Sequence, residues 1–206
     1  MKNRFAISAA LVLVTGMGLA FAGETAKPAA QAAPAVQAED PKAKEFKDIL
    51  FKLVRQDEYL DEAIDVLDSS NGRLSAHDAT AMGLNLKMIA GSLAKVSELN
   101  KKEFASIQPG SSLANYTNTI LSYSRKVDRK AARVNLIIAQ ISAKSKKAAM
   151  RDAVSSKKGA KKGGKKLTQM LEEKNALAAL AADAKKLRGA SRDLSATSKW
   201  LYIASK

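Results

Sequence analysis

The sequence of residues 111–156 is SSLANYTNTILSYSRKVDRKAARVNLIIAQISAKSKKAAMRDAVSS, a run of 46 residues that contains neither Pro nor Gly. Apolar residues recur in it at alternating spacings of three and four, which is the period of an amphipathic helix. The apolar residues that share one face are Leu113, Tyr116, Ile120, Tyr123, Val127, Val134, Ile137 and Ile141. The stretch therefore predicts one long helix, and the rest of the chain is expected to cover its apolar stripe.

Three further segments have the same period and predict helices over residues 43–69, 75–106 and 168–204. In the first of them Asp57 takes the one stripe position that is polar. The stripes consist of Phe46, Leu50, Leu53, Leu60, Ile64 and Leu67 in the first segment, Met82, Leu86, Ile89, Leu93 and Val96 in the second, and Met170, Leu177, Leu180, Ala184, Leu187, Leu194 and Leu201 in the last.

Local signals are expected to set the ends of these helices. The Asn-Gly pair at residues 71–72 ends the first helix, and Ser75 with Asp78 has the form of a capping box that begins the second. The Gln-Pro-Gly sequence at residues 108–110 ends the second helix. Thr168 is expected to cap the last one.

The connections between the predicted helices are short, and no segment has the alternating pattern of a strand. The predicted fold class is all-α, an antiparallel up-down-up-down four-helix bundle. The third and fourth helices, of about 46 and 38 residues, are longer than the first two, of about 27 and 32. If the second helix flanks the third, the second helix covers the third only as far as about Ser142. The extra length of the third and fourth helices predicts that helices 3 and 4 project as a basic-tipped hairpin, some 15 to 20 Å past the bundle at about 1.5 Å per residue.

The N-terminal residues 1–22 have the parts of a secretory signal peptide. Lys2 and Arg4 form a basic start, residues 5–19 form an apolar run, and an Ala-x-Ala sequence ends at Ala22. We expect cleavage after Ala22 and a periplasmic or secreted location. The alternative is an uncleaved membrane anchor, because an apolar run of this length can just span a bilayer.

The remaining chain divides into a linker and one domain. Residues 23–42 are rich in Ala, Pro and Gln and predict a disordered linker, and residues 43–206 form the helical-bundle domain. The chain has no Cys, which excludes disulfides, thiolate metal sites, Cys nucleophiles and covalently attached haem. No sequence pattern indicates a cofactor, so none is predicted.

The charge is strongly positive and unevenly distributed. Without Lys2 and Arg4 the 35 basic residues become 33 against 20 acidic ones, a net charge of +13. Residues 42–68 contain five basic and eight acidic side chains, whereas residues 111–167 contain fifteen basic and two acidic. A basic balance of this size favours anionic partners, in a way that weakens with salt.

The densest positive charge lies in the low-complexity run KKGAKKGGKK at residues 157–166. Its glycines predict a mobile loop, which would collect phosphate or carboxylate groups by charge alone. The alternative is a soluble loop without a partner. No aromatic residue lies between the lysines, which disfavours base stacking and sequence-specific nucleic-acid binding. The predicted anion-binding residues are Lys157, Lys158, Lys161, Lys162, Lys165 and Lys166.

Two patterns that superficially resemble metal or nucleotide sites have simpler explanations. Residues 67–78 resemble an EF-hand loop, but Leu67 and Ser69 stand where the first ligands belong, so a capped helical turn is expected. Residues 159–166 resemble a P-loop but lack its final Ser or Thr and a preceding strand.

His77 is the only histidine, and we expect it to be solvated at the start of the second helix. No metal site is predicted.

Carboxylates form a ladder along the first helix at spacings of four: Asp57, Asp61 and Asp65, flanked by Glu58 and Glu62. Paired carboxylates can bind hard cations or carry out acid-base chemistry. A simpler interpretation is a face directed at a basic neighbour. The third helix offers such a face, with Arg125, Lys126, Arg129, Lys130 and Arg133.

Aromatic residues are concentrated at the end of the bundle opposite the lysine run. They are expected to form a core plug, or alternatively a docking patch for a hydrophobic partner. The residues concerned are Phe46, Phe51, Phe104, Tyr116, Tyr123, Trp200 and Tyr202.

These patterns predict a non-enzymatic exported helical-bundle protein. Its predicted partner is an anionic surface, such as phospholipid, lipopolysaccharide or a wall polymer, bound through the 157–166 loop. One alternative is a protein–protein interaction module, a periplasmic adapter or chaperone-like protein. A third possibility is that the secreted protein binds nucleic acid without sequence preference, at low salt only.

Overall fold

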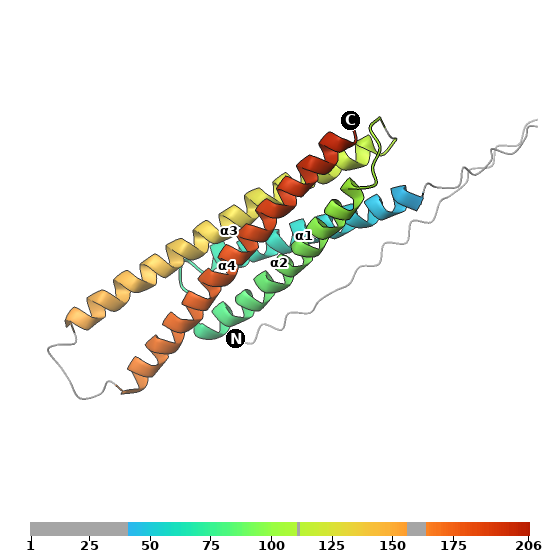
Figure 1. The fold of residues 1–206 in the computed structure, drawn as a ribbon. Helices are drawn as coiled ribbons and strands as arrows, with labels where there is room; N and C mark the ends of the chain where they lie inside the picture. The colour runs from blue at the N-terminus through green and yellow to red at the C-terminus, as the bar shows by residue number, and fades with distance from the viewer. Residues whose placement is uncertain (1–40, 111, 156–163) are drawn as a thin grey trace, which may run out of the picture. The chain divides into compact units, whose positions relative to one another are not determined.

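The computed structural model describes residues 41–110, 112–155 and 164–206. In these ranges the chain forms four helices and no strand, and the helices pack together as a bundle (Figure 1). The helices are α1 (Pro41–Ser69), α2 (Ala76–Phe104), α3 (Ala114–Ser155) and α4 (Gly164–Ala204). The all-helical class and the bundle packing are thereby confirmed. The predicted signal peptide and residues 23–40 of the predicted linker lie outside the described residues.

The turn between α1 and α2 has the local geometry that its sequence predicts. Asn71 and Gly72 have φ angles of 51° and 77°, the left-handed conformation that ends a helix. Ser75 is the N-cap of α2, and its Oγ accepts a hydrogen bond from the backbone N–H of Asp78 at 3.1 Å. The stretch that superficially resembled a calcium loop is therefore a capped helical turn.

The predicted start of α4 is wrong. The helix begins at Gly164, so Thr168 lies inside it and is not its cap. The intervening residues, Lys165, Lys166 and Leu167, are good helix formers and extend the helix back to the glycine. Similarly, α1 begins at Pro41, within the predicted linker, because proline is favoured at the first position of a helix.

Of the sequential neighbours that the short connections suggest, α1 and α2 pack together and so do α3 and α4, but among the described residues α2 and α3 do not. α4 packs against α2 and α3, and α1 packs against α3 and, less closely, against α2. Within the described ranges α2 does not pack against α3, and α1 does not pack against α4. The expectation that the second helix flanks the third is therefore wrong, because α4 lies between them.

The core contains most of the predicted apolar stripes. The α2 stripe is buried throughout, and so are five of the eight stripe residues of α3, with Tyr116, Tyr123 and Ile137 partly buried. Met170, which was assigned to the α4 stripe, is exposed. Near the C-terminal half of α4 the core becomes polar, because α4 meets its neighbours there through small hydroxyl side chains.

This polar seam is a chain of buried hydrogen bonds between α4 and its two neighbours. The amide of Asn100 donates to Ser198 Oγ at 2.9 Å, and the hydroxyls of Ser124 and Ser198 lie 2.7 Å apart. Further pairs link Ser97 with Thr197 at 3.2 Å and Thr117 with Ser205 at 2.7 Å. Small side chains allow the helices to approach closely, and the hydrogen bonds offset the cost of burying the hydroxyls.

The predicted aromatic plug is largely wrong. Phe46 is fully buried, but Phe51 is 65 % exposed and Trp200 is 56 % exposed. Phe104 is also exposed. Tyr116 and Tyr123 are partly buried against the core, so only some of the expected rings contribute to it.

Candidate functional site

The predicted anion-binding lysines lie at or beyond the limit of the described structure. Lys157, Lys158, Lys161 and Lys162 lie outside the described residues. Lys165 and Lys166 belong to the first turn of α4 rather than to a loop, and the structure describes their backbone only. The described parts of α3 and α4 nevertheless show how charge is arranged on the helices that lead to this segment.

Along the contact between α1 and α3, acidic and basic side chains pair closely, as the carboxylate ladder predicted. Asp57 binds the ammonium groups of both Lys126 and Lys130, each at 2.6 Å. Lys130 also binds Asp61 at 2.6 Å. About two turns further along α1, Asp68, rather than the predicted Asp65, pairs with an α3 cation, Arg133, at 2.7 Å. The ladder thus holds two helices together, as the interpretation of a face directed at a basic neighbour predicted.

The environment of Asp57 shifts two pKa values. Burial would raise the pKa of Asp57, but the ammonium groups of Lys126 and Lys130 outweigh that effect and hold the pKa below its usual value of 3.8. The same hydrogen bond from Lys126 to Asp57 raises the pKa of Lys126. Asp57 therefore stays ionised near neutral pH, so it is unsuited to general acid catalysis there.

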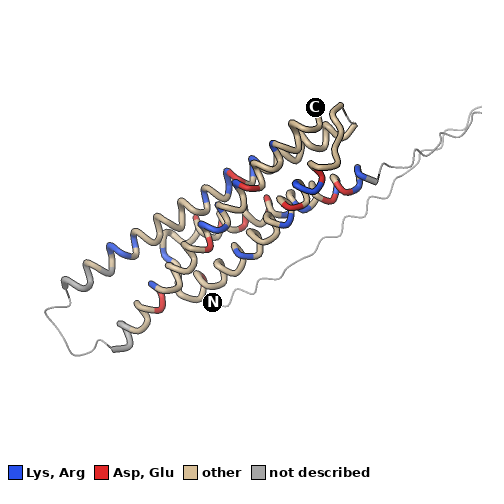
Figure 2. Tube along the Cα trace, in the orientation of Figure 1, with Lys and Arg blue, Asp and Glu red and all other residues tan. Residues whose placement is uncertain are grey.

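A second set of cations lies on and beside the C-terminal half of α3. It consists of Lys144, Lys146 and Lys147 of α3 and Arg73 of the α1–α2 turn. None of them makes an ion pair with a described residue. Figure 2 shows basic residues continuing along α3 toward Ser155, where α1 no longer accompanies it. The carboxylates of α1 therefore pair with Lys126, Lys130 and Arg133, whereas Arg125 and Arg129 of the predicted basic face make no ion pair with a described residue.

Arg73 and Lys144 border a depression of about 620 Å³ beside the α1–α2 turn. The turn residues 71–75 form one wall, α3 contributes residues from Ile141 to Ala148, and α4 contributes Glu173 and Leu177. The carboxylate of Glu173 reduces the positive charge of this depression. It is an extension of the cationic surface of α3 rather than an enclosed binding site.

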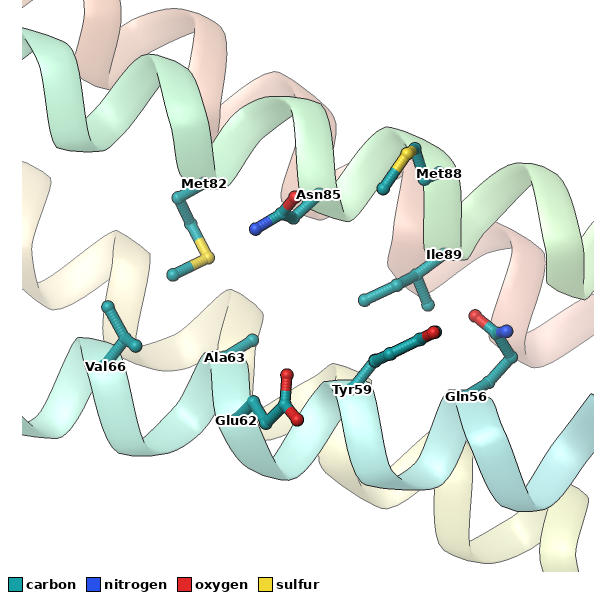
Figure 3. Close-up of a pocket in the computed structure, with 9 residues that line it drawn as sticks. All are labelled: Gln56, Tyr59, Glu62, Ala63, Val66, Met82, Asn85, Met88 and Ile89. Atoms are coloured by element: carbon teal, nitrogen blue, oxygen red, sulfur yellow. The ribbon is translucent and has the colours of Figure 1, made fainter. Parts of the chain in front are cut away.

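A groove of about 360 Å³ lies between α1 and α2, the least closely packed pair of contacting helices (Figure 3). Its lining is mainly apolar, with Glu62, Gln56 and Asn85 as the polar members. The apolar lining residues are Tyr59, Ala63, Val66, Met82, Met88 and Ile89. The exposed Leu84 lies one helical turn from Met88 on the α2 surface.

The groove was not predicted, although the sequence contains a signal for it. Tyr59 and Val66 are seven residues apart, and Leu84 and Met88 are four apart, so each pair shares a helix face. Neither pair belongs to the core stripe of its helix, and all four side chains are exposed. Two apolar faces outside the core stripes are typical of an interaction surface.

The described residues contain no group of three or more His, Asp or Glu side chains arranged to hold a metal ion. His77 is exposed in the first turn of α2, as predicted.

No family model, curated protein or solved structure matches this chain. In the described part of the chain, no helix has the length and apolar character needed to cross a membrane. Inferences about function therefore rest on the charge distribution and the groove alone.

Proposed function

We propose that this protein is an exported, non-enzymatic helical-bundle protein that binds anionic surfaces through the lysine-rich segment 157–166. The surfaces have the chemistry of phospholipid head groups, lipopolysaccharide or an anionic wall polymer. The proposal includes the up-down-up-down course of the chain and an α3–α4 hairpin that carries this segment at its tip.

The main support is the difference between paired and unpaired cations on α3. Lys126, Lys130 and Arg133 are neutralised by carboxylates of α1, whereas Lys144, Lys146 and Lys147 pair with no described residue. Unpaired cations that lead toward a further six lysines create a local positive potential. Such a potential attracts anionic polymers and membranes.

The lengths of the helices support the hairpin. The α1–α2 turn lies beside Ala148 of α3 and Glu173 of α4, while α3 continues to Ser155 and α4 begins at Gly164. Lys165 and Lys166 stand in the first turn of α4, where the helix dipole is positive and disfavours cations. A bound anion would offset this repulsion.

The test is co-sedimentation with vesicles that contain phosphatidylglycerol, compared with vesicles of phosphatidylcholine alone. We expect salt-sensitive binding to the anionic vesicles only. Each lysine near an anionic membrane contributes about 1 kcal/mol, so replacing Lys157, Lys158, Lys161, Lys162, Lys165 and Lys166 by Gln should weaken binding at least about 100-fold. Lipopolysaccharide and an anionic wall polymer, tested in the same way, identify the preferred surface.

The matched control removes the same charge from other parts of the surface, by replacing six exposed lysines with Gln. We expect it to bind nearly as well as the unchanged protein. Equal binding by the two six-lysine variants would contradict the proposed role of the segment. The control lysines are Lys44, Lys102, Lys185, Lys186, Lys199 and Lys206.

The alternative function, a protein–protein interaction module, has its own support in the groove between α1 and α2. A partner bound there would be insensitive to the lysine replacements. Non-specific nucleic-acid binding, the third possibility, predicts that duplex DNA is retarded at low salt and released at physiological salt without sequence preference.

A further inference from the structure

The α1–α2 groove has a charge distribution that is complementary to a second copy of itself. Tyr59 and Met88 lie on opposite sides of the groove, toward the end lined by Gln56 and Ile89. Arg55 precedes Tyr59 by four residues and Glu62 follows it by three, so a basic and an acidic side chain lie on either side of Tyr59 along α1. The α1 surface beside the groove is therefore positive on one side of Tyr59 and negative on the other.

Two further lysines, Lys52 and Lys95, add positive charge on the Arg55 side of Tyr59. Lys52 and Lys95 lie seven residues from Tyr59 and Met88, respectively, and so share their helix faces. Both stand toward the Arg55 end, because α1 and α2 run in opposite directions past the groove, with Val66 near Met82 and Gln56 near Ile89. Glu62 lies on the other side of Tyr59, in the middle of the α1 wall of the groove. All of these charged side chains are exposed.

We propose that the α1–α2 groove is the interface of a homodimer, in which two copies of this chain pack face to face with their α1 helices antiparallel. A two-fold axis perpendicular to α1 near Tyr59 places Arg55 of one copy opposite Glu62 of the other, and the pair occurs twice because the interface is isologous. The exposed apolar side chains Tyr59, Val66 and Met88 then bury one another across the axis.

Arg55 is already held in a suitable position. Its guanidinium lies over the rings of both Phe51 and Tyr59, with 5.9 Å to each ring centroid, and donates a hydrogen bond to the Tyr59 hydroxyl at 3.2 Å. These contacts restrict the side chain to the surface beside the groove. Less conformational freedom is then lost when it meets a carboxylate of the second copy.

This inference is independent of the proposed anionic-surface binding, because no residue of the groove belongs to the lysine-rich segment. The test is sedimentation equilibrium of the purified exported protein over about 5 to 500 µM, a range suited to a small, weak interface. We expect a reversible monomer–dimer equilibrium. A protein that stays monomeric up to about 500 µM overturns the proposal and leaves the groove to another polypeptide.

Two kinds of variant test the interface itself. Met88→Glu places a charge opposite Tyr59 in the wall of the groove and should abolish the dimer. The control, Leu136→Glu, changes a comparably exposed apolar residue, 58 % exposed against 69 %, on α3 and should leave the dimer intact. Equal effects of the two variants, or a dimer that survives Met88→Glu, overturn the proposal.

A charge exchange tests the predicted antiparallel arrangement. Arg55→Glu alone and Glu62→Arg alone each place like charges opposite each other and should weaken association at least about tenfold. The double variant R55E/E62R restores opposite charges and should recover most of the lost affinity. Thermal unfolding followed by circular dichroism verifies that each variant is folded. Folded single variants that associate normally, or a double variant without recovery, contradict the arrangement.

Discussion

Asp57 shows how a single residue can break the apolar pattern of a helix without destabilising it. The residue is only 5 % exposed and stands at a stripe position of α1, yet each of its carboxylate oxygens meets an ammonium group at 2.6 Å. Those ammonium groups belong to α3, so the carboxylate is stabilised by a contact between helices. Burial of a carboxylate is tolerated when such partners compensate its lost hydration.

We predict that Asp57→Asn lowers the free energy of unfolding by about 1 to 3 kcal/mol at pH 7, since Lys126 and Lys130 lose their shared counter-ion. The folded-state pKa of Asp57 lies below 3.8, so the stabilising effect of the carboxylate is complete above pH 3.8. It is lost as the pH falls through the folded-state pKa. The difference between variant and unchanged protein should therefore shrink in strong acid, as urea unfolding at several pH values would show.

Asp61→Asn is the control for this measurement, because Asp61 shares Lys130 but has a side chain that is 56 % exposed. We expect the free energy of unfolding to fall by less than about 1 kcal/mol, as for other exposed ion pairs. Equal losses for the two variants, or an Asp57→Asn effect that does not change between neutral and strongly acidic solution, would argue against this account of Asp57.

At the scale of the element, α2 is a helix whose two internal glycines have different surroundings. A methyl group on Gly83 would come within 3.1 Å of Asp183 Oδ2, an atom of a buried side chain on α4. A methyl group on Gly91 would meet no atom within 4 Å. Close approach of α4 therefore explains the glycine at position 83, and nothing in the structure explains the one at position 91.

These surroundings predict opposite effects of alanine on stability. Gly91→Ala should raise the free energy of unfolding by about 0.5 to 1 kcal/mol, because alanine loses less backbone entropy in a helix. Gly83→Ala should lower it, because the methyl group displaces Asp183 and weakens its contact with Lys87, which lies 3.5 Å away. Both values follow from thermal or urea unfolding. A stabilising effect of Gly83→Ala equal to that of Gly91→Ala would show that α2 and α4 are not in close contact there.

At the scale of the whole molecule, the order of the helices around the bundle is its least obvious property. α4 lies between α2 and α3, so each of them contacts α4 and not the other. The buried hydroxyl seam explains the preference, because Ser97, Ser124 and Thr117 all find their partners on α4. Helices with small polar side chains on two faces can contact two neighbours closely.

The absence of natural Cys allows this order to be tested by engineered disulfides. The side-chain oxygens of Ser97 and Thr197 lie 3.2 Å apart, so Ser97→Cys with Thr197→Cys should form an intramolecular disulfide on oxidation. Ser97→Cys with Ser124→Cys should not, because α2 and α3 do not pack together and a disulfide needs Cα atoms within about 7 Å. Peptide mapping by mass spectrometry distinguishes the two results. A disulfide in the second pair only would contradict this order.

Some features of the fold and the site could be derived from sequence because they depend on neighbouring residues. The period of the apolar residues determines the four helices and most of their buried faces. The Asn-Gly turn and the Ser75 cap follow from backbone preferences of single residues, which is why both were predicted correctly. The carboxylate ladder of α1 indicated a basic partner, because eight acidic side chains within 27 residues need nearby cations or water.

The tertiary structure alone decided three things: which helices are neighbours, where buried hydroxyl side chains form the contact between helices, and where the apolar groove lies. Each of these depends on the relative positions of side chains that are far apart in the chain. Sequence periodicity identifies a face but not the helix that covers it. The stretch at residues 111–156 thus determined its own helix, whereas the pairing of Lys126, Lys130 and Arg133 with carboxylates depended on the position of α1.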